Sequence, residues 1–275
     1  MALLLGLIVG AVLGLTGAGG SIIAVPLLMA GLGWTLPQAA PVALLAVCAA
    51  ATFGTIAAWD VAYVRYRAAL LMALAGFVTA PFGLKAAAAL PVTTLTAVFA
   101  AVLAAVAMRM LWQAWRAPSE AAIVRATVAG DSGRSQGKRV RLNSEGRILW
   151  TKPAVASVGV IGAVTGFLSG LLGVGGGFVI VPALRAASEL SMHSAIATSL
   201  LAIALTSAGT VTAALVQGVE ISWLTALPFV LGALAGMLAG RKLAPRIAGP
   251  KLQQGFSVVM LLTALGLGAH ALQWI

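Results

Sequence analysis

Residues 1–59 contain no Asp, Glu, Lys or Arg, and the first charged side chain of the chain belongs to Asp60. Over all 275 residues, 61% of side chains are hydrophobic and 8% are charged, whereas soluble domains average about 25% charged residues. A spanning helix needs about 20 mainly apolar residues, and this sequence has several such stretches. These features exclude a water-soluble globular protein and predict an all-α polytopic membrane protein.

Eight apolar segments are separated by short connectors and by one long polar stretch. The segments cover residues 2–33, 38–58, 68–90, 92–115, 154–184, 194–217, 222–240 and 252–274. The polar stretch has eight of the 17 Lys and Arg residues and few large apolar side chains, so it cannot build a core. We therefore expect a first transmembrane repeat (1–115), a basic cytoplasmic linker (116–153) and a second transmembrane repeat (154–275).

The two repeats begin with similar sequences. Gly14-Leu-Thr-Gly-Ala-Gly-Gly-Ser-Ile-Ile-Ala-Val-Pro26 matches Gly170-Leu-Leu-Gly-Val-Gly-Gly-Gly-Phe-Val-Ile-Val-Pro182 at a constant offset of 156 residues. Glycine-rich helices often look alike by chance, but matched glycines followed by a matched proline indicate an internal duplication.

The positions of the basic residues predict how the second copy is oriented. If the copies were parallel, 11 Lys and Arg residues would lie inside and 6 outside. If the second copy is inverted, 16 lie inside and only Lys85 lies outside, as the positive-inside rule requires. The sequence thus predicts two homologous inverted repeats in the cell membrane, each with a Gly-broken hairpin or re-entrant first segment followed by three spanning helices.

The length of the first segment in each repeat supports this break. Residues 2–33 are too many for one crossing and too few for two full ones, since an arm of ~15 residues reaches only ~22 Å. We expect hairpin tips at Gly17–Ser21 and Gly173–Gly177, inside the membrane. Two short crossings, or one long tilted helix with a glycine kink, are the alternatives.

A helix that restarts after each tip presents free N–H groups and a partial positive charge, which together favour an anion. The predicted binding residues at the tips are Thr16, Gly17, Gly19, Gly20, Ser21, Gly173, Gly175, Gly176 and Gly177. The alternative is that these glycines only allow close helix packing. For Gly232, Gly236 and Gly240 we favour packing, because their four-residue spacing forms a stripe along one helix face.

Four further hydroxyls are candidates for lining the path of the anion: Thr198, Ser199, Thr206 and Ser207. Each of them has a structural alternative, because Ser and Thr in helices often bond the carbonyls of their own helix.

Other classes of function have little support in the sequence. No predicted span contains Asp or Glu, which argues against a carboxylate relay for protons or sodium. The sequence has no acid pair and no metal-ligand constellation, so we expect no enzyme activity, no metal and no cofactor. The single cysteine, Cys48, is interpreted as a small buried hydrophobe. The net charge of +11 follows membrane topology and does not indicate nucleic acid.

The two glycine-rich motifs that end at Pro26 and Pro182 resemble those of the sulfite exporter TauE/SafE family, and the resemblance covers the chain except its linker. It implies a membrane transporter, often an exporter, for sulfite or small organosulfonates. We therefore expect a small anion and the lipid bilayer as partners, with alternating access around the tips. A homodimer is a further possible assembly. An anion channel and a non-transporting membrane scaffold are the alternative functions.

Overall fold

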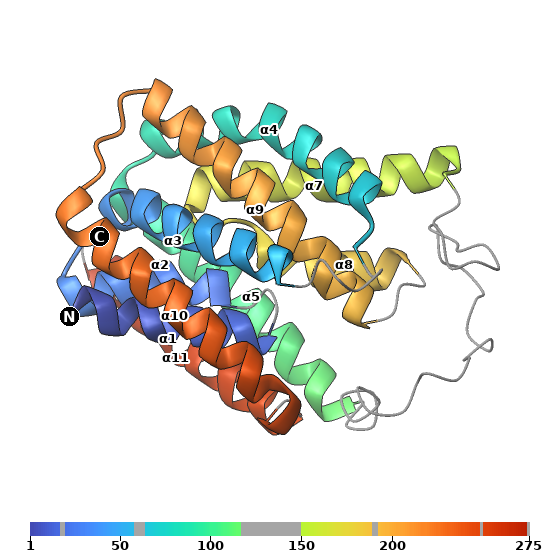
Figure 1. Ribbon diagram of the computed structural model, residues 1–275. Coiled ribbons are helices and arrows are strands. Elements are labelled where there is room, and N and C mark those ends of the chain that lie inside the picture. Colours follow the sequence, from blue (N-terminus) through green and yellow to red (C-terminus); the bar gives the residue numbers. More distant parts are fainter. Residues whose placement is uncertain (17–19, 58–63, 117–149, 189–191, 248–249, 274–275) are drawn as a thin grey trace.

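The computed structural model describes residues 1–16, 20–57, 64–116, 150–188, 192–247 and 250–273 (Figure 1). These residues form the helices α1 (Ala2–Thr16), α2 (Gly20–Leu32), α3 (Leu36–Ile56), α4 (Tyr66–Ala89), α5 (Val92–Arg116), α7 (Lys152–Leu172), α8 (Gly177–Ala187), α9 (Met192–Val216), α10 (Trp223–Ile247) and α11 (Pro250–Gln273). Within the described residues, α3, α4, α5, α7, α9 and α10 are long and apolar enough to cross a membrane. The predicted all-α polytopic membrane protein is confirmed.

Each repeat begins with a broken segment. The predicted segment 2–33 contains the two short helices α1 and α2. The predicted segment 154–184 covers most of α7 and α8, which begin at Lys152 and end at Ala187. The break in the second repeat has three glycines with positive φ angles, at Gly173, Gly175 and Gly176, so the alternative of one continuous kinked helix is wrong there. In the first half, α1 ends at Thr16 and α2 begins at Gly20, and residues 17–19 lie outside the described residues.

Two pairs of helices pack with their backbones in close approach, and glycines make this possible. A Cβ atom added to Gly6 or Gly10 of α1 would overlap backbone of Phe229 or Ala233 in α10. In return, a Cβ on Gly232, Gly236 or Gly240 would overlap the carbonyl oxygens of Leu3, Leu7 and Ala11 in α1. The predicted packing stripe on α10 is confirmed, and its partner is α1.

The same arrangement recurs between α7 and α4. Glycines 162, 166 and 170 of α7 stand 156 positions after glycines 6, 10 and 14 of α1, and they contact α4 at Met72, Gly76 and Ala80. Small residues at such contacts let helices approach closely enough for strong van der Waals packing in lipid. Each half of the chain therefore contributes its first helix to a pair with a helix of the other half.

The helix contacts in one half of the chain have matching contacts in the other half. α1 packs on α10, and its counterpart α7 packs on α4, the counterpart of α10. Likewise α3 contacts α10 while α9 contacts α4, and the counterpart pairs α3–α9 and α5–α11 also pack together (Figure 1). α3 and α9 are more buried than the other spans. The two halves of the chain are thus interlocked around a centre formed by α3 and α9.

The paired residues also give the directions of the helices. Successive glycines along α1 meet successively later residues of α10, so these two helices run the same way, as α7 and α4 also do. By contrast, Cys48 and Gly54 of α3 lie against Ala204 and Leu200 of α9. The counterparts α3 and α9 therefore run in opposite directions.

Two arginines lie at the same end of the bundle. The Arg241 side chain donates to the Gly54 oxygen at 2.6 Å and to the Ala57 oxygen at 3.1 Å, which caps the C-terminus of α3. The Arg65 N–H donates to Thr198 Oγ1 at 3.0 Å, in the turn of α9 that reaches Gly54 through Leu200. Lys85 lies 19 residues after Tyr66 along α4, so it is about 28 Å away at the other end.

Large apolar side chains cover the outer faces of α4 and α10. On α4 they recur at helical spacing and are more than half exposed at Leu70, Leu74, Phe77, Val78 and Phe82. On α10, Leu224, Leu227 and Leu231 are similarly exposed. A soluble monomer rarely exposes such a contiguous apolar surface. These two helices therefore present a face suited to lipid.

Candidate functional site

The second glycine tip is a sharp backbone turn between α7 and α8. Gly173 ends α7 with φ 70° and donates its N–H to the Ser169 oxygen at 2.9 Å. Gly175 follows with φ 71° and Gly176 with φ 66°, and α8 begins at Gly177. A residue with a side chain rarely adopts this left-handed conformation, which explains why glycine recurs here.

Three elements enclose this tip. A Cβ on Gly173 would overlap Ala40 of α3, and one on Gly176 would overlap Thr165 of α7. A Cβ on Gly175 would lie 2.8 Å from Ser207 Oγ of α9 and 2.9 Å from Val47 Cγ1 of α3. All residues from 171 to 177 are buried. The tip is thus held inside the protein, between the two central helices.

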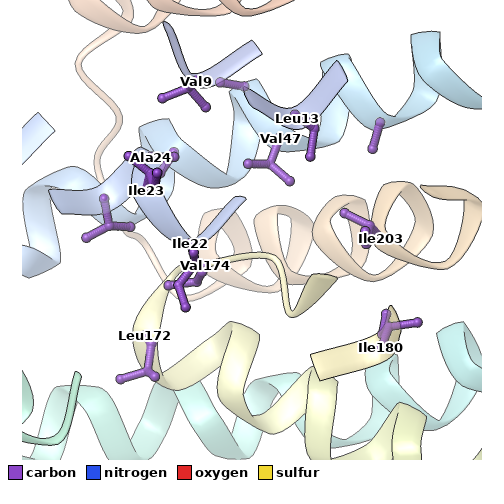
Figure 2. Packing of buried hydrophobic residues seen from close by; sticks show 14 of the residues in the cluster. Val9, Leu13, Ile22, Ile23, Ala24, Val47, Leu172, Val174, Ile180 and Ile203 are labelled. Carbon is purple, nitrogen blue, oxygen red and sulfur yellow. The ribbon is translucent and has the colours of Figure 1, made fainter. Parts of the chain in front are cut away.

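The hydrophobic cluster of the centre surrounds the tip as well. Val174, the one residue of the turn with a large side chain, is fully buried in the same cluster as Ile22 of α2 and Ile203 of α9 (Figure 2). The Val174 side chain anchors the turn in the apolar cluster, whereas the neighbouring glycines have no side chain to shield their backbone.

The tip lies at about half the height of the bundle. Its neighbour Val47 comes 11 residues after Leu36 and 9 residues before Ile56, the two ends of α3. At 1.5 Å per residue, each end of α3 is about 14–17 Å from that point. Irregular backbone at such a depth is tolerated only where protein or a water-filled cavity surrounds it.

Three N–H groups of the tip are not used in backbone hydrogen bonds among the described residues. In the part of the chain that the structure describes, the N–H groups of Gly175, Gly176 and Gly177 have no hydrogen-bond acceptor. The N–H groups of Val179 and Ile180 bond the Gly176 oxygen, so the regular bonding of α8 starts only behind the tip. Free N–H groups at a helix N-terminus favour a negatively charged partner.

Ser207 adds a hydroxyl at the same place. Its side chain is fully buried, and its Oγ has no hydrogen-bond partner among the described residues. Leaving a buried donor unsatisfied costs about 1–3 kcal/mol, so such groups are rare in proteins. The hydroxyl and the free N–H groups together form an arrangement that an anion can satisfy.

The other predicted hydroxyls of α9 do not gather at the tip. Ser199 Oγ donates to the Ile196 oxygen at 2.8 Å, and Thr206 Oγ1 donates to the Ala202 oxygen at 2.8 Å, both within their own helix. Thr198 Oγ1 accepts the N–H of Arg65 at one end of the bundle. Of these four hydroxyls, the structure brings only that of Ser207 to the glycine tip.

The first glycine tip is only partly described. Gly17 and Gly19 lie outside the described residues, and Thr16 is the last residue of α1. Gly20 and Ser21 begin α2, are buried, and belong to a helix that contacts α8.

Some neighbours of the site were not predicted from the sequence. Ala40, Val47 and Thr165 enclose the tip, but their types and spacing give no signal for it. Arg65 has a buried Nε without a partner among the described residues, whereas in the sequence it counts only as one of the 16 basic residues on the predicted inner side. Among the described residues, no group of three or more His, Cys, Asp or Glu side chains could hold a metal ion.

Comparison with known proteins identifies the family. The profile of the family described as "Sulfite exporter TauE/SafE" matches residues 2–267. Two proteins of Xylella fastidiosa, each named "Probable membrane transporter protein", are similar over 94% of this chain and 90% of their own length. Their identities are 31% for strain Temecula1 and 33% for strain 9a5c.

A protein of Bacillus subtilis with a similar name is 34% identical over 108 residues, which is 39% of each chain. No solved structure matches this chain significantly. The profile match across nearly the whole chain confirms the resemblance seen in the two glycine motifs, and the chain belongs to the sulfite exporter TauE/SafE family of membrane transporters.

Proposed function

We propose that this protein exports a small oxyanion, sulfite or an organosulfonate, across the cell membrane and binds it at the two glycine tips. The substrate class is suggested by the description of the family. In the second half-site, the N–H groups of Gly175, Gly176 and Gly177 hold the oxygens of the anion, together with the hydroxyl of Ser207. Gly20 and Ser21 at the start of α2 provide the first half-site.

The observation that carries this proposal is the unpartnered Ser207 Oγ next to Gly175, in a turn whose three N–H groups also have no acceptor in the described residues. A neutral apolar solute would leave all of these donors unsatisfied. A cation would be repelled by the positive end of α8. An oxyanion supplies several acceptor oxygens at once, and hydrogen bonds to a charged group are about twice as strong as neutral ones.

Inverted repeats and alternating access are part of the proposal. The opposite directions of the counterparts α3 and α9 support inversion, as does the exchange of helix contacts between the copies. In transporters with inverted repeats, the substrate lies near the midplane at discontinuous helices, and the repeats rock around it. The position of Gly175 beside Val47, near the middle of α3, fits such a site.

Orientation follows from the charged end of the bundle. We place the end with Arg65 and Arg241 in the cytoplasm, together with the linker 116–153, and Lys85 outside. An anion then leaves a negative interior, and the membrane potential supplies about 2.3 kcal/mol per unit charge per 100 mV. Export needs no carboxylate relay under this arrangement.

Ser207→Ala tests the site with the full chain reconstituted in vesicles. The hydroxyl has no partner within the described residues, so its removal should leave the melting temperature unchanged or slightly higher. Loss of a hydrogen bond to a charged substrate should raise the KM for sulfite efflux roughly tenfold or more. Initial rates over a range of sulfite concentrations measure this KM.

Ser157→Ala is the matched control, since Ser157 Oγ of α7 already donates to the Pro153 oxygen at 2.7 Å, outside the site. Its KM should equal that of the unmodified protein. An unchanged KM in Ser207→Ala would overturn the assignment of the tip as the binding site.

A further inference from the structure

Arg65 has a fixed backbone at the start of α4. Its N–H donates to Thr198 Oγ1 at 3.0 Å, and its oxygen accepts the N–H groups of Ala68 at 3.0 Å and Ala69 at 3.1 Å. Thr198 is fully buried, so this contact ties the beginning of α4 firmly to α9. The first part of the Arg65 side chain therefore leaves the backbone at a defined place.

The Nε of the Arg65 guanidinium has no role in the part of the structure that is described. It is shielded from solvent and has no hydrogen-bond partner among the described residues. Arg241, at the same end of the bundle, instead donates to two carbonyl oxygens of α3. An arginine is always charged and carries five donors, so a buried N–H without an acceptor is costly. Arg241 has a structural role, whereas the described residues offer no acceptor to the Nε of Arg65.

We propose that Arg65 and Thr198 form a second anion subsite at the predicted cytoplasmic end, which a small oxyanion occupies on its way to the glycine tip. The oxygen of Thr198 accepts the Arg65 N–H, which leaves the proton of its hydroxyl to donate to the anion. A guanidinium group binds the oxygens of such an anion in a fixed, often bidentate geometry. This inference rests on the proposed transport of an oxyanion.

The subsite is separate from the tip. Thr198 comes nine residues before Ser207 in α9, which corresponds to about 13–14 Å along the helix. At 100° per residue, the two side chains also leave α9 on opposite faces. One anion therefore cannot contact both hydroxyls at once, and binding at Arg65 must precede or follow binding at the tip.

The first experiment compares Arg65→Ala with Arg67→Ala in sulfite efflux from vesicles. Arg67 is exposed two positions further on, so its replacement removes the same charge without touching the subsite. Arg65→Ala should raise the KM roughly tenfold, and Arg65→Lys should restore part of the loss because it restores the charge. Arg67→Ala should keep the KM. Equal KM values in Arg65→Ala and Arg67→Ala would overturn the subsite.

A binding measurement separates this subsite from the tip. Full-length protein with Ser207→Ala is purified in detergent, and sulfite is titrated while the melting temperature is followed. The remaining sulfite-induced rise in Tm should disappear when Arg65→Ala is added and persist when Arg67→Ala is added. If both double variants keep the rise, the Arg65 subsite is wrong, whatever the outcome at Ser207. If Ser207→Ala alone has no effect, the tip proposal fails while the Arg65 comparison still stands.

The anion at Arg65 has two sources with the same oxygen chemistry, the free substrate and the phosphate of a lipid headgroup. The titration is repeated in bilayers of phosphatidylcholine with and without phosphatidylglycerol. Competition by phosphatidylglycerol that depends on Arg65 supports the subsite with a headgroup as an occupant. A sulfite effect that depends on Arg65 and is the same in both bilayers supports it with the free anion.

Discussion

At Gly175, two constraints exclude a side chain independently. Its φ angle of 71° lies in the left-handed region, which costs other residues roughly 1–2 kcal/mol. The space that a Cβ would enter lies between Ser207 Oγ and Val47 Cγ1, at 2.8 and 2.9 Å. The second constraint also concerns the proposed function, because the atom that a Cβ would meet is the hydroxyl oxygen proposed to bind the anion.

We predict that Gly175→Ala abolishes or strongly reduces sulfite efflux while the protein still inserts into the membrane. The added methyl group blocks the approach to Ser207. Gly218→Ala is the matched control, since Gly218 has a φ angle of 79° and open space around it. It should have a similar backbone strain and normal efflux. Vesicle flux and membrane abundance measure the two effects, and normal efflux in Gly175→Ala would contradict the proposed site.

The sequence predicts part of this site. Glycine runs that interrupt an apolar segment predict the break at Gly173–Gly177, because regular helix is unfavourable there. The sequence does not predict that the hydroxyl without a partner in the described residues belongs to Ser207. Ser199 and Thr206 are equally plausible from the sequence. α9 is apolar around its circumference, so no amphipathic stripe fixes which side faces the tip. That rotation is set by packing against α3 and α4, and the binding role of these residues stays a prediction.

Between elements, glycine stripes determine which helices pair. The four-residue spacing of Gly232, Gly236 and Gly240 predicts a packing face on α10, and the structure confirms it. The spacing does not name the partner, because a small-residue stripe fits any helix that presents a similar face. The partner α1 is more than 200 residues away in the sequence, so only the tertiary structure identifies it.

We predict that Gly10→Ala lowers the free energy of unfolding in detergent by about 1–3 kcal/mol, because the new methyl group would overlap the Ala233 backbone in α10. Gly159→Ala in α7 is the control, since a Cβ at Gly159 meets nothing within 4 Å. This control should keep or gain stability, because alanine favours helix more than glycine does. Denaturant melts give the free energy of unfolding of both variants. Equal values for Gly10→Ala and Gly159→Ala would argue against close α1–α10 packing.

For the whole molecule, composition alone predicts the helical membrane fold, and charge placement predicts the inverted repeats. The interlocking of the repeats is not predictable in this way. Hydropathy locates spans but carries no information on which spans touch, and the pairs α1–α10 and α4–α7 join segments far apart in the chain. The second helices of the two broken segments also differ in length, since α2 has 13 residues and α8 has 11.

Orientation is testable with single cysteines in a Cys48→Ala background. Lys85 and Lys242 are exposed and lie on the counterpart helices α4 and α10. In inverted repeats, a membrane-impermeant maleimide should label Lys85→Cys in intact cells and Lys242→Cys only after permeabilisation. The Cys48→Ala protein should remain unlabelled. Labelling of both positions from the same side would show that the repeats are parallel.

Because α1 packs on α10, the contact between these two helices can form only late in translation. About 200 residues separate the end of α1 from the start of α10, so a ribosome adding about 5–20 residues per second needs roughly 10–40 s to supply the partner. During that interval α1 is without α10, the helix against which its Gly6 and Gly10 pack. A chain released before α10 is made would lack the α1–α10 contact, even if its first helices had inserted into the membrane.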